Sequence, residues 1–199
     1  MVNFSKSAFT LLISGLFSSA SFAAEFSLSS PDLQPEKAIK SEQYWNSFGC
    51  QGSNIRPRLK WQNAPKKTKS FAVTMYDNDA PTGSGFWHWL VHDIPLTSNS
   101  LSSTFLPEEA IEGNTDMGKP GYFGPCPPEG RKHSYTFKVY ALDVEELAVP
   151  KGGNKCTDRV FLTPALFTNS RDHSNGWTAL GDKNEGFTFT HSFNGTMQQ

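Results

Sequence analysis

Two groups of polar side chains lie beside rigid turns in this 199-residue chain, and both have residue types suited to acid–base or anion-binding chemistry. The first group is Asp77-Asn78-Asp79-Ala80-Pro81, followed by Trp87-His88-Trp89. The second is Gly124-Pro125-Cys126-Pro127-Pro128, followed by His133-Ser134-Tyr135. Imidazole and phenol groups can donate hydrogen bonds to an oxyanion, and two close carboxylates can share a proton or bind a metal. The residue types alone therefore allow a binding pocket, an acid–base pair or a metal site.

In the first group, Asp77 and Asp79 are two residues apart and would share one face of an extended chain. Pro81 keeps Ala80 extended and ends the strand. An Asp in such a turn can also serve only as an acceptor for backbone N–H groups. We assign that structural role to Asp79 and favour a pocket role for Asp77. A strand-turn-strand would bring His88 back to Asp77, which leaves a pocket role and a core role for His88 about equally supported.

In the second group, His133 and Tyr135 are same-face neighbours at the start of a strand and would form a donor set for an oxyanion. Tyr135 could instead belong to the core, in which case its hydroxyl needs a hydrogen-bond partner. Glycines such as Gly124 let backbone N–H groups approach a ligand closely. No nucleophile elbow, P-loop or dinucleotide fingerprint is present, and no cysteine or histidine spacing suggests zinc. The pattern favours a binding site over catalysis, with no metal and no cofactor.

The N-terminus has the pattern of a secretory signal peptide. Lys6 precedes a short apolar stretch at 8–17, and Ser21-Phe22-Ala23 offers small residues for cleavage before Ala24. The alternative is a membrane anchor, but the apolar stretch is too short to span a bilayer comfortably. We therefore predict a signal peptide over 1–23, export to the periplasm or the extracellular space, and no integral membrane segment after cleavage.

Removal of residues 1–23 would also remove Lys6 and no acid. The number of Lys and Arg residues falls from 18 to 17 while Asp and Glu stay at 19, so the net charge of the mature chain is −2. A nucleic acid as partner would normally require a basic surface, and so would general adhesion to anionic membranes. The charge therefore argues against both.

Export makes a disulfide possible, and the chain has three cysteines, Cys50, Cys126 and Cys156. The sequence allows three pairings or none. Cys50 and Cys126 both lie in turns flanked by Gly or Pro, so we favour that pair, with Cys156 left over. Buried free thiols are the alternative.

Strands dominate the elements that must position these groups. Residues 70–76, 87–94 and 134–142 read as strands, and no apolar helical period runs over three turns of the mature chain. The expected inward side chains are Phe71, Val73, Met75, Tyr135, Phe137, Val139 and Ala141. Trp87 and Trp89 should share a face opposite His88, and His92 should be a solvated strand residue. The segment 106–110 could make one helical turn, and Phe187 and Phe189 suggest a terminal strand. The fold class is mostly β: an antiparallel two-sheet sandwich with short helices.

Taken together, these stretches resemble the phosphatidylethanolamine-binding protein family, in its bacterial Raf-kinase-inhibitor-like branch (the YbhB/YbcL type). The matching stretches are 70–85, Trp87-His88-Trp89, 122–130, His133-Ser134-Tyr135, Phe48-Gly49-Cys50 and Asn54. The resemblance covers residues 25–150. It implies a sandwich of two antiparallel sheets with a small anion pocket at one end, which binds phosphate-type head groups. Because some members of the family inhibit kinases or proteases, the resemblance also implies that such inhibition is an alternative function.

By position, the resemblance places Asp77, His88, Gly124, His133 and Tyr135 around this pocket. Residues 151–199 lack the amphipathic C-terminal helix expected of the family, so we divide the mature chain into a sandwich domain at 24–150 and a divergent extension of that domain at 151–199. The predicted function is an exported, non-enzymatic protein that binds a small anion or a phospholipid head group of the phosphate or phosphoethanolamine type. The alternatives are an inhibitor-like signalling partner of a kinase or protease, acting through its surface, and, least favoured, an Asp/His hydrolase.

Overall fold

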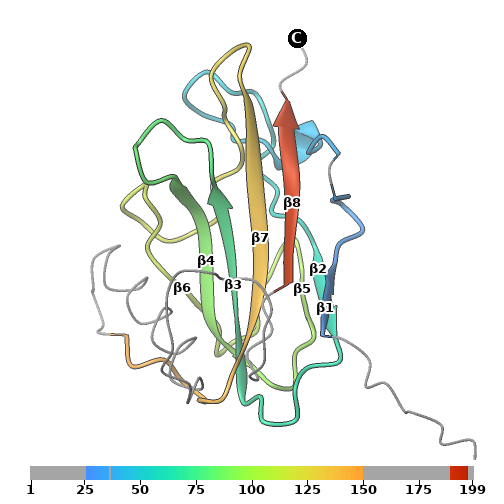
Figure 1. Ribbon diagram of the computed structural model, residues 1–199. Coiled ribbons are helices and arrows are strands. Elements are labelled where there is room, and N and C mark those ends of the chain that lie inside the picture. The colour runs from blue at the N-terminus through green and yellow to red at the C-terminus, as the bar shows by residue number, and fades with distance from the viewer. Residues whose placement is uncertain (1–25, 36, 150–188, 197–199) are drawn as a thin grey trace, which may run out of the picture.

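The computed structural model describes residues 26–35, 37–149 and 189–196 (Figure 1). The predicted signal peptide, Cys156 and Phe187 lie outside these residues, so the structure does not test what the sequence predicts for them. The described elements are β1 (Ser27–Ser29), the 3-10 helix η1 (Ser41–Gln43), β2 (Leu59–Gln62), β3 (Ser70–Asp77), β4 (Phe86–Pro95), β5 (Ser100–Leu101), β6 (Ile111–Glu112), β7 (Lys132–Leu142) and β8 (Phe189–Thr196).

The strands form two antiparallel sheets, which confirms the predicted fold class. One sheet has the order β1-β2-β5 and the other the order β6-β4-β3-β7-β8. Within the described ranges η1 is the single helical element, and the segment 106–110 forms a turn in which the Ala110 amide donates to the Pro107 carbonyl at 3.1 Å. No helix among these residues is long and apolar enough to cross a membrane.

The main core lies between the two sheets. Leu28, Leu59, Trp61 and Leu101 of the smaller sheet pack with the larger one, whose inward side chains on β3 and β7 are those that the alternation predicts. The Trp61 and Phe71 rings, one from each sheet, lie 5.2 Å apart between centroids. Large aromatic rings bury much apolar area per residue, which stabilises a sandwich of this size.

A β-bulge in β4 changes the expected face of Trp87. Met75 pairs with Trp89 and Tyr76 pairs with Trp87, so His88 is an extra residue in the ladder. Trp89 therefore lies in the core between the sheets, whereas Trp87 packs with the cluster on the other face of the large sheet. The prediction that both tryptophans share a face was wrong, because a single inserted residue reverses the alternation beyond it.

His92 is buried, with 3% of its surface exposed, and the prediction of a solvated residue was wrong. Strand β4 lies between β3 and β6, and both of its faces are covered from His88 to Ile94. An alternation argument assumes one solvated face, which this strand does not have.

The tail contributes an edge strand. β8 pairs antiparallel with β7 from Lys132↔Thr196 to Val139↔Phe189, and Figure 1 shows the two strands side by side. The strand suggested by Phe189 is thus confirmed. The domain boundary at residue 150 stays a prediction.

Candidate functional site

A cavity of about 680 Å³ opens where β3 ends and where β4 and β7 begin. Three polar side chains lie deep in it: Asp77, His88 and His133 are 3%, 8% and 6% exposed. The remaining lining residues are largely apolar: Trp45, Phe48, Gly49, Cys50, Ala80, Pro81, Thr82, Phe86, Met117, Phe123, Cys126, Pro127, Pro128 and Glu129. The cavity thus combines a polar floor with aromatic and proline walls.

Asp77 is the last residue of β3, and its two carboxylate oxygens have different partners. Oδ1 accepts a hydrogen bond from the Asp79 amide at 2.9 Å, which closes a turn. Oδ2 lies 2.7 Å from His133 Nδ1. An ionised carboxylate only accepts hydrogen bonds, so the Nδ1–H of His133 is the donor. The turn and the antiparallel pairing of β3 with β7 bring these residues together.

Asp79 has the structural role predicted for it. Its Oδ2 accepts the Ser134 amide at 2.6 Å, while the Asn78 side chain donates to Thr136 Oγ1 at 2.8 Å. These contacts fix the turn after β3 against the first residues of β7. They hold Asp77 and His133 in register without entering the cavity.

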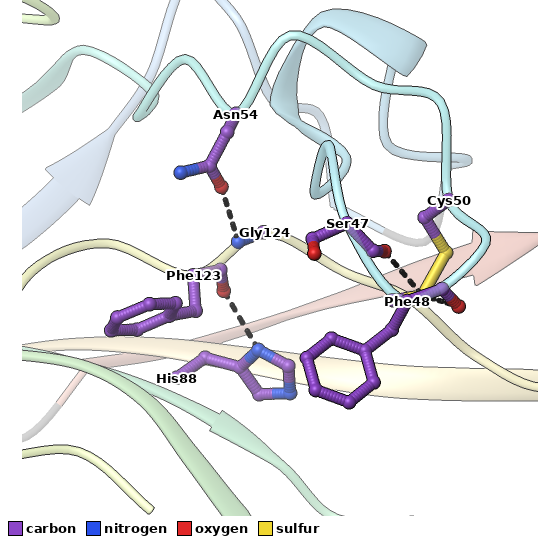
Figure 2. The surroundings of a disulfide bond; sticks show 8 residues. Ser47, Phe48, Cys50, Asn54, His88, Phe123 and Gly124 are labelled. Carbon is purple, nitrogen blue, oxygen red and sulfur yellow. Dashed lines mark hydrogen bonds between the residues drawn. A yellow bond between two sulfur atoms is a disulfide. The ribbon is translucent and has the colours of Figure 1, made fainter. Parts of the chain in front are cut away.

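His88 is the bulge residue of β4, and bulges commonly redirect a side chain beside a site. Its Nδ1 lies 2.7 Å from the Phe123 carbonyl oxygen (Figure 2). A carbonyl can only accept, so Nδ1 carries the proton and Nε2 is left for a ligand. His88 Nε2 is 3.8 Å from Asp77 Oδ2, which is an ion-pair distance and too long for a hydrogen bond. His88 thus lies near Asp77, as expected, but the short hydrogen bond of the Asp77 carboxylate is made with His133.

The charge state of Asp77 follows from these contacts. Burial alone would raise the pKa of this carboxyl group. Its interactions with His88 and His133 and the Asp79 amide outweigh burial and hold the pKa below its usual value. The floor therefore keeps a fixed negative charge beside two imidazoles.

Tyr135 packs behind the imidazoles and does not line the cavity. Its ring meets the His88 ring edge-on at 5.3 Å and is fully buried. The hydroxyl has no hydrogen-bond partner within the part of the chain that the structure describes. Burial, and then the Asp77 charge, raise the pKa of this phenol, so it stays protonated. Its role as a donor to a ligand stays a prediction.

Gly124 also lies behind the cavity lining. Its amide donates to Asn54 Oδ1 at 2.8 Å (Figure 2). Asn54 Nδ2 in turn donates to the Tyr122 carbonyl at 3.0 Å. A Cβ at Gly124 would lie 2.0 Å from the Gln43 carbonyl oxygen, so glycine is required for close packing. Because this amide is already bonded, the contact it makes is structural, and a ligand role for Gly124 stays a prediction.

The structure contains the Cys50–Cys126 disulfide, which confirms the favoured pairing. Both half-cystines line the cavity, so the bond joins its two loop walls. The Cys126 sulfur also lies 3.8 Å from the Ser47 carbonyl oxygen and 3.9 Å from that of Phe48 (Figure 2). A half-cystine has no proton to donate, so these are packing contacts.

Sequence reasoning missed the apolar walls. Trp45, Phe86, Met117 and Phe123 have no spacing that marks them as a set, because they come from four separate segments. The sequence signal that could have indicated an apolar wall was Phe48-Gly49-Cys50, in which an aromatic residue lies close to a cysteine in a turn. Within the described residues, no group of three or more His, Cys, Asp or Glu is placed to hold a metal ion.

The model of the family described as phosphatidylethanolamine-binding protein matches residues 29–163. This chain belongs to the phosphatidylethanolamine-binding protein family. The UPF0098 protein YbcL of Escherichia coli is 42% identical over 151 residues, which cover 70% of this chain and 82% of YbcL. The UPF0098 protein YbhB of the same organism is 42% identical over 133 residues, which cover 64% of this chain and 84% of YbhB.

Solved structures agree with this membership in the family. The crystal structure of E. coli YbcL, described as a member of the mammalian PEBP family, matches with a TM-score of 0.73 and 34% identity, covering 88% of this chain and 100% of that one. A putative phosphatidylethanolamine-binding protein homologue from Chlamydia trachomatis matches with a TM-score of 0.62 and 26% identity, covering 87% and 97%. The family and its ligand-binding fold are thus shown for this chain.

Proposed function

We propose that this family member binds a small phosphate-type anion, free or as a phospholipid head group, in the cavity and catalyses no reaction. The observation that supports the proposal is the pair of buried imidazoles, each with its Nδ1–H already donated, one to the Phe123 carbonyl and one to Asp77. Each ring has one nitrogen left, Nε2. This nitrogen can donate to an oxyanion only when the ring is protonated.

Among the described lining residues, the thiol and hydroxyl groups are already engaged, which favours binding over catalysis. Cys50 and Cys126 are joined to each other, and the Thr82 hydroxyl donates to the Gly85 carbonyl at 2.5 Å. Covalent catalysis needs a hydroxyl or thiol beside a base, and these side chains are committed elsewhere.

The test is a calorimetric titration with inorganic phosphate and, separately, with phosphoethanolamine. Replacing His88 and His133 together with alanine should abolish the binding of both, because the anion loses both of its donors. His92→Asn is the matched control, since His92 is equally buried and lies outside the cavity. Unchanged affinity in the double variant would refute the proposal.

Tyr135→Phe should separate stability from binding. The hydroxyl has no partner among the described residues, so its removal relieves a buried polar group and should leave the free energy of unfolding unchanged or raise it by up to about 1 kcal/mol. If the hydroxyl donates to the bound anion, phosphate affinity falls about fivefold or more, the loss expected for one hydrogen bond to a charged group. A variant with full affinity would show that Tyr135 acts only through packing.

We also propose that the protein is exported. The disulfide supports this, since such bonds persist in oxidising compartments. Mass spectrometry of the periplasmic fraction and of the culture medium should give, in one of them, a chain that begins at Ala24 and contains the disulfide. Recovery of the intact chain in the cytoplasmic fraction would contradict export.

A further inference from the structure

One wall of the cavity is a series of aromatic rings that runs from its mouth to its polar floor. Phe48 stacks on Trp45 with centroids 4.8 Å apart and planes at 23°. Trp45 meets Phe123 edge-on at 5.8 Å, and the Phe123 carbonyl accepts a hydrogen bond from His88 Nδ1. The rings thus lead directly to one of the two imidazoles that we propose as anion donors.

Phe48 occupies its position at a conformational cost. Its φ is 54°, in the left-handed region that bulky side chains avoid because it is conformationally unfavourable. The side chain is 78% exposed, so it contributes little to the core. Neither local conformational preference nor burial explains a phenylalanine at this position.

The loop that carries Phe48 is nevertheless firmly held. The Trp45 amide donates to the Pro125 carbonyl at 3.1 Å, and the Gly52 amide donates to the Trp45 carbonyl at 2.8 Å. Cys50, two residues beyond Phe48, is joined to Cys126 on the facing loop. Figure 2 shows the Phe48 ring close to this disulfide, on the His88 side of the loop. The exposed Phe48 ring is thus held at the wall of the cavity that His88 also lines.

The volume of the cavity exceeds what a small anion needs. At about 680 Å³ it falls within the range of about 300–1,000 Å³ that is typical of sites for drug-sized ligands. Inorganic phosphate on the floor would leave the parts of Trp45 and Phe48 that line the cavity without a ligand contact. Rigid Pro127 and Pro128 belong to the lining as well, so the walls suit a flat group. A flexible chain would lose more conformational freedom there than a rigid ring.

We propose that Phe48, stacked on Trp45, is the specificity-determining residue of the cavity and selects anions that carry an aromatic ring, such as aryl phosphate monoesters. The phosphate group contacts the His88 and His133 floor, and the aryl ring packs against the Phe48–Trp45 wall. The inference rests on the proposed function, because the anion end requires that floor. Offset stacking of rings gives a preference beyond simple apolar burial.

The experiment compares phenyl phosphate, cyclohexyl phosphate and inorganic phosphate by calorimetry on the full chain. In the wild type we expect phenyl phosphate to bind about threefold to tenfold more tightly than cyclohexyl phosphate, the gain expected from a ring–ring contact. Phe48→Gly should remove this preference and leave the affinity for inorganic phosphate unchanged. Glycine adopts the same φ without strain, so the loop is kept.

Two further variants complete the design. Phe48→Tyr keeps a ring and should retain the preference. Phe105→Ala removes another exposed phenylalanine, 70% exposed and outside the cavity lining, and should also retain it. Equal affinities for phenyl and cyclohexyl phosphate in the wild type, or a preference that survives in Phe48→Gly, would overturn this inference and leave the proposed function standing. Failure of all three ligands to bind would refute the proposed function itself.

Discussion

Replacing Cys50 and Cys126 with serine is expected to lower the free energy of unfolding by about 4 kcal/mol. The two half-cystines are 76 residues apart in sequence, so the bond closes a long loop and restricts the unfolded chain strongly. The loss is large against the 5–15 kcal/mol or so by which a typical domain is stable. This loss can be measured by urea denaturation, with tryptophan fluorescence as the probe of unfolding.

The comparison is best made in a Cys156→Ser background, since a third thiol could otherwise exchange with the disulfide. Cys156→Ser alone is the reference, and the triple variant differs from it only by the disulfide. A loss of less than about 1 kcal/mol would show that the unfolded state gains little freedom when the loop is opened.

Asp77→Asn should have the second largest effect on stability, with a loss of about 3 kcal/mol at pH 7. The carboxylate is 3% exposed and bonded to His133 Nδ1 at 2.7 Å, so the variant removes the charged partner of a buried pair. Asp79→Asn is the matched control. Asp79 is exposed and bonds a backbone amide, so we expect its loss to stay within about 1 kcal/mol.

The effect of Asp77→Asn should also depend on pH with a definite sign. The pKa of Asp77 is lower in the folded protein than its usual value, so its ionisation stabilises the fold above the unfolded pKa of about 3.9. That contribution is lost as the pH falls through the lower, folded pKa. The difference between wild type and variant should therefore be largest at pH 5 and above and should shrink steadily below pH 4. A difference that grows on acidification would contradict this assignment.

Much of the site could be predicted because its residues lie at or next to the ends of strands. Asp77 directly follows one predicted strand, His88 lies in the next, and His133 directly precedes a third, so antiparallel pairing brings all three to one edge. The role of Asp79 follows from turn chemistry, and the choice of Cys50 and Cys126 follows from their turns. Each of these conclusions depends on neighbours in sequence.

The bulge at His88 could not be predicted in this way. Strict alternation places Trp87 with Trp89, and only the pairing of β4 with β3 shows the inserted residue that separates them. The burial of His92 has the same kind of cause, because it depends on tertiary packing that covers both faces of β4.

By itself, the sequence determined the strand pattern, the inward aromatic side chains and the order of the polar groups, since period-2 alternation and turn residues act over a few positions. Only the tertiary structure decided which imidazole bonds Asp77, which amides are already engaged, and that the rings of Phe48, Trp45 and Phe123 form one wall. Those features depend on side-chain distances between segments up to about eighty residues apart in sequence, and such distances are set when the sheets pack and the disulfide closes the loops.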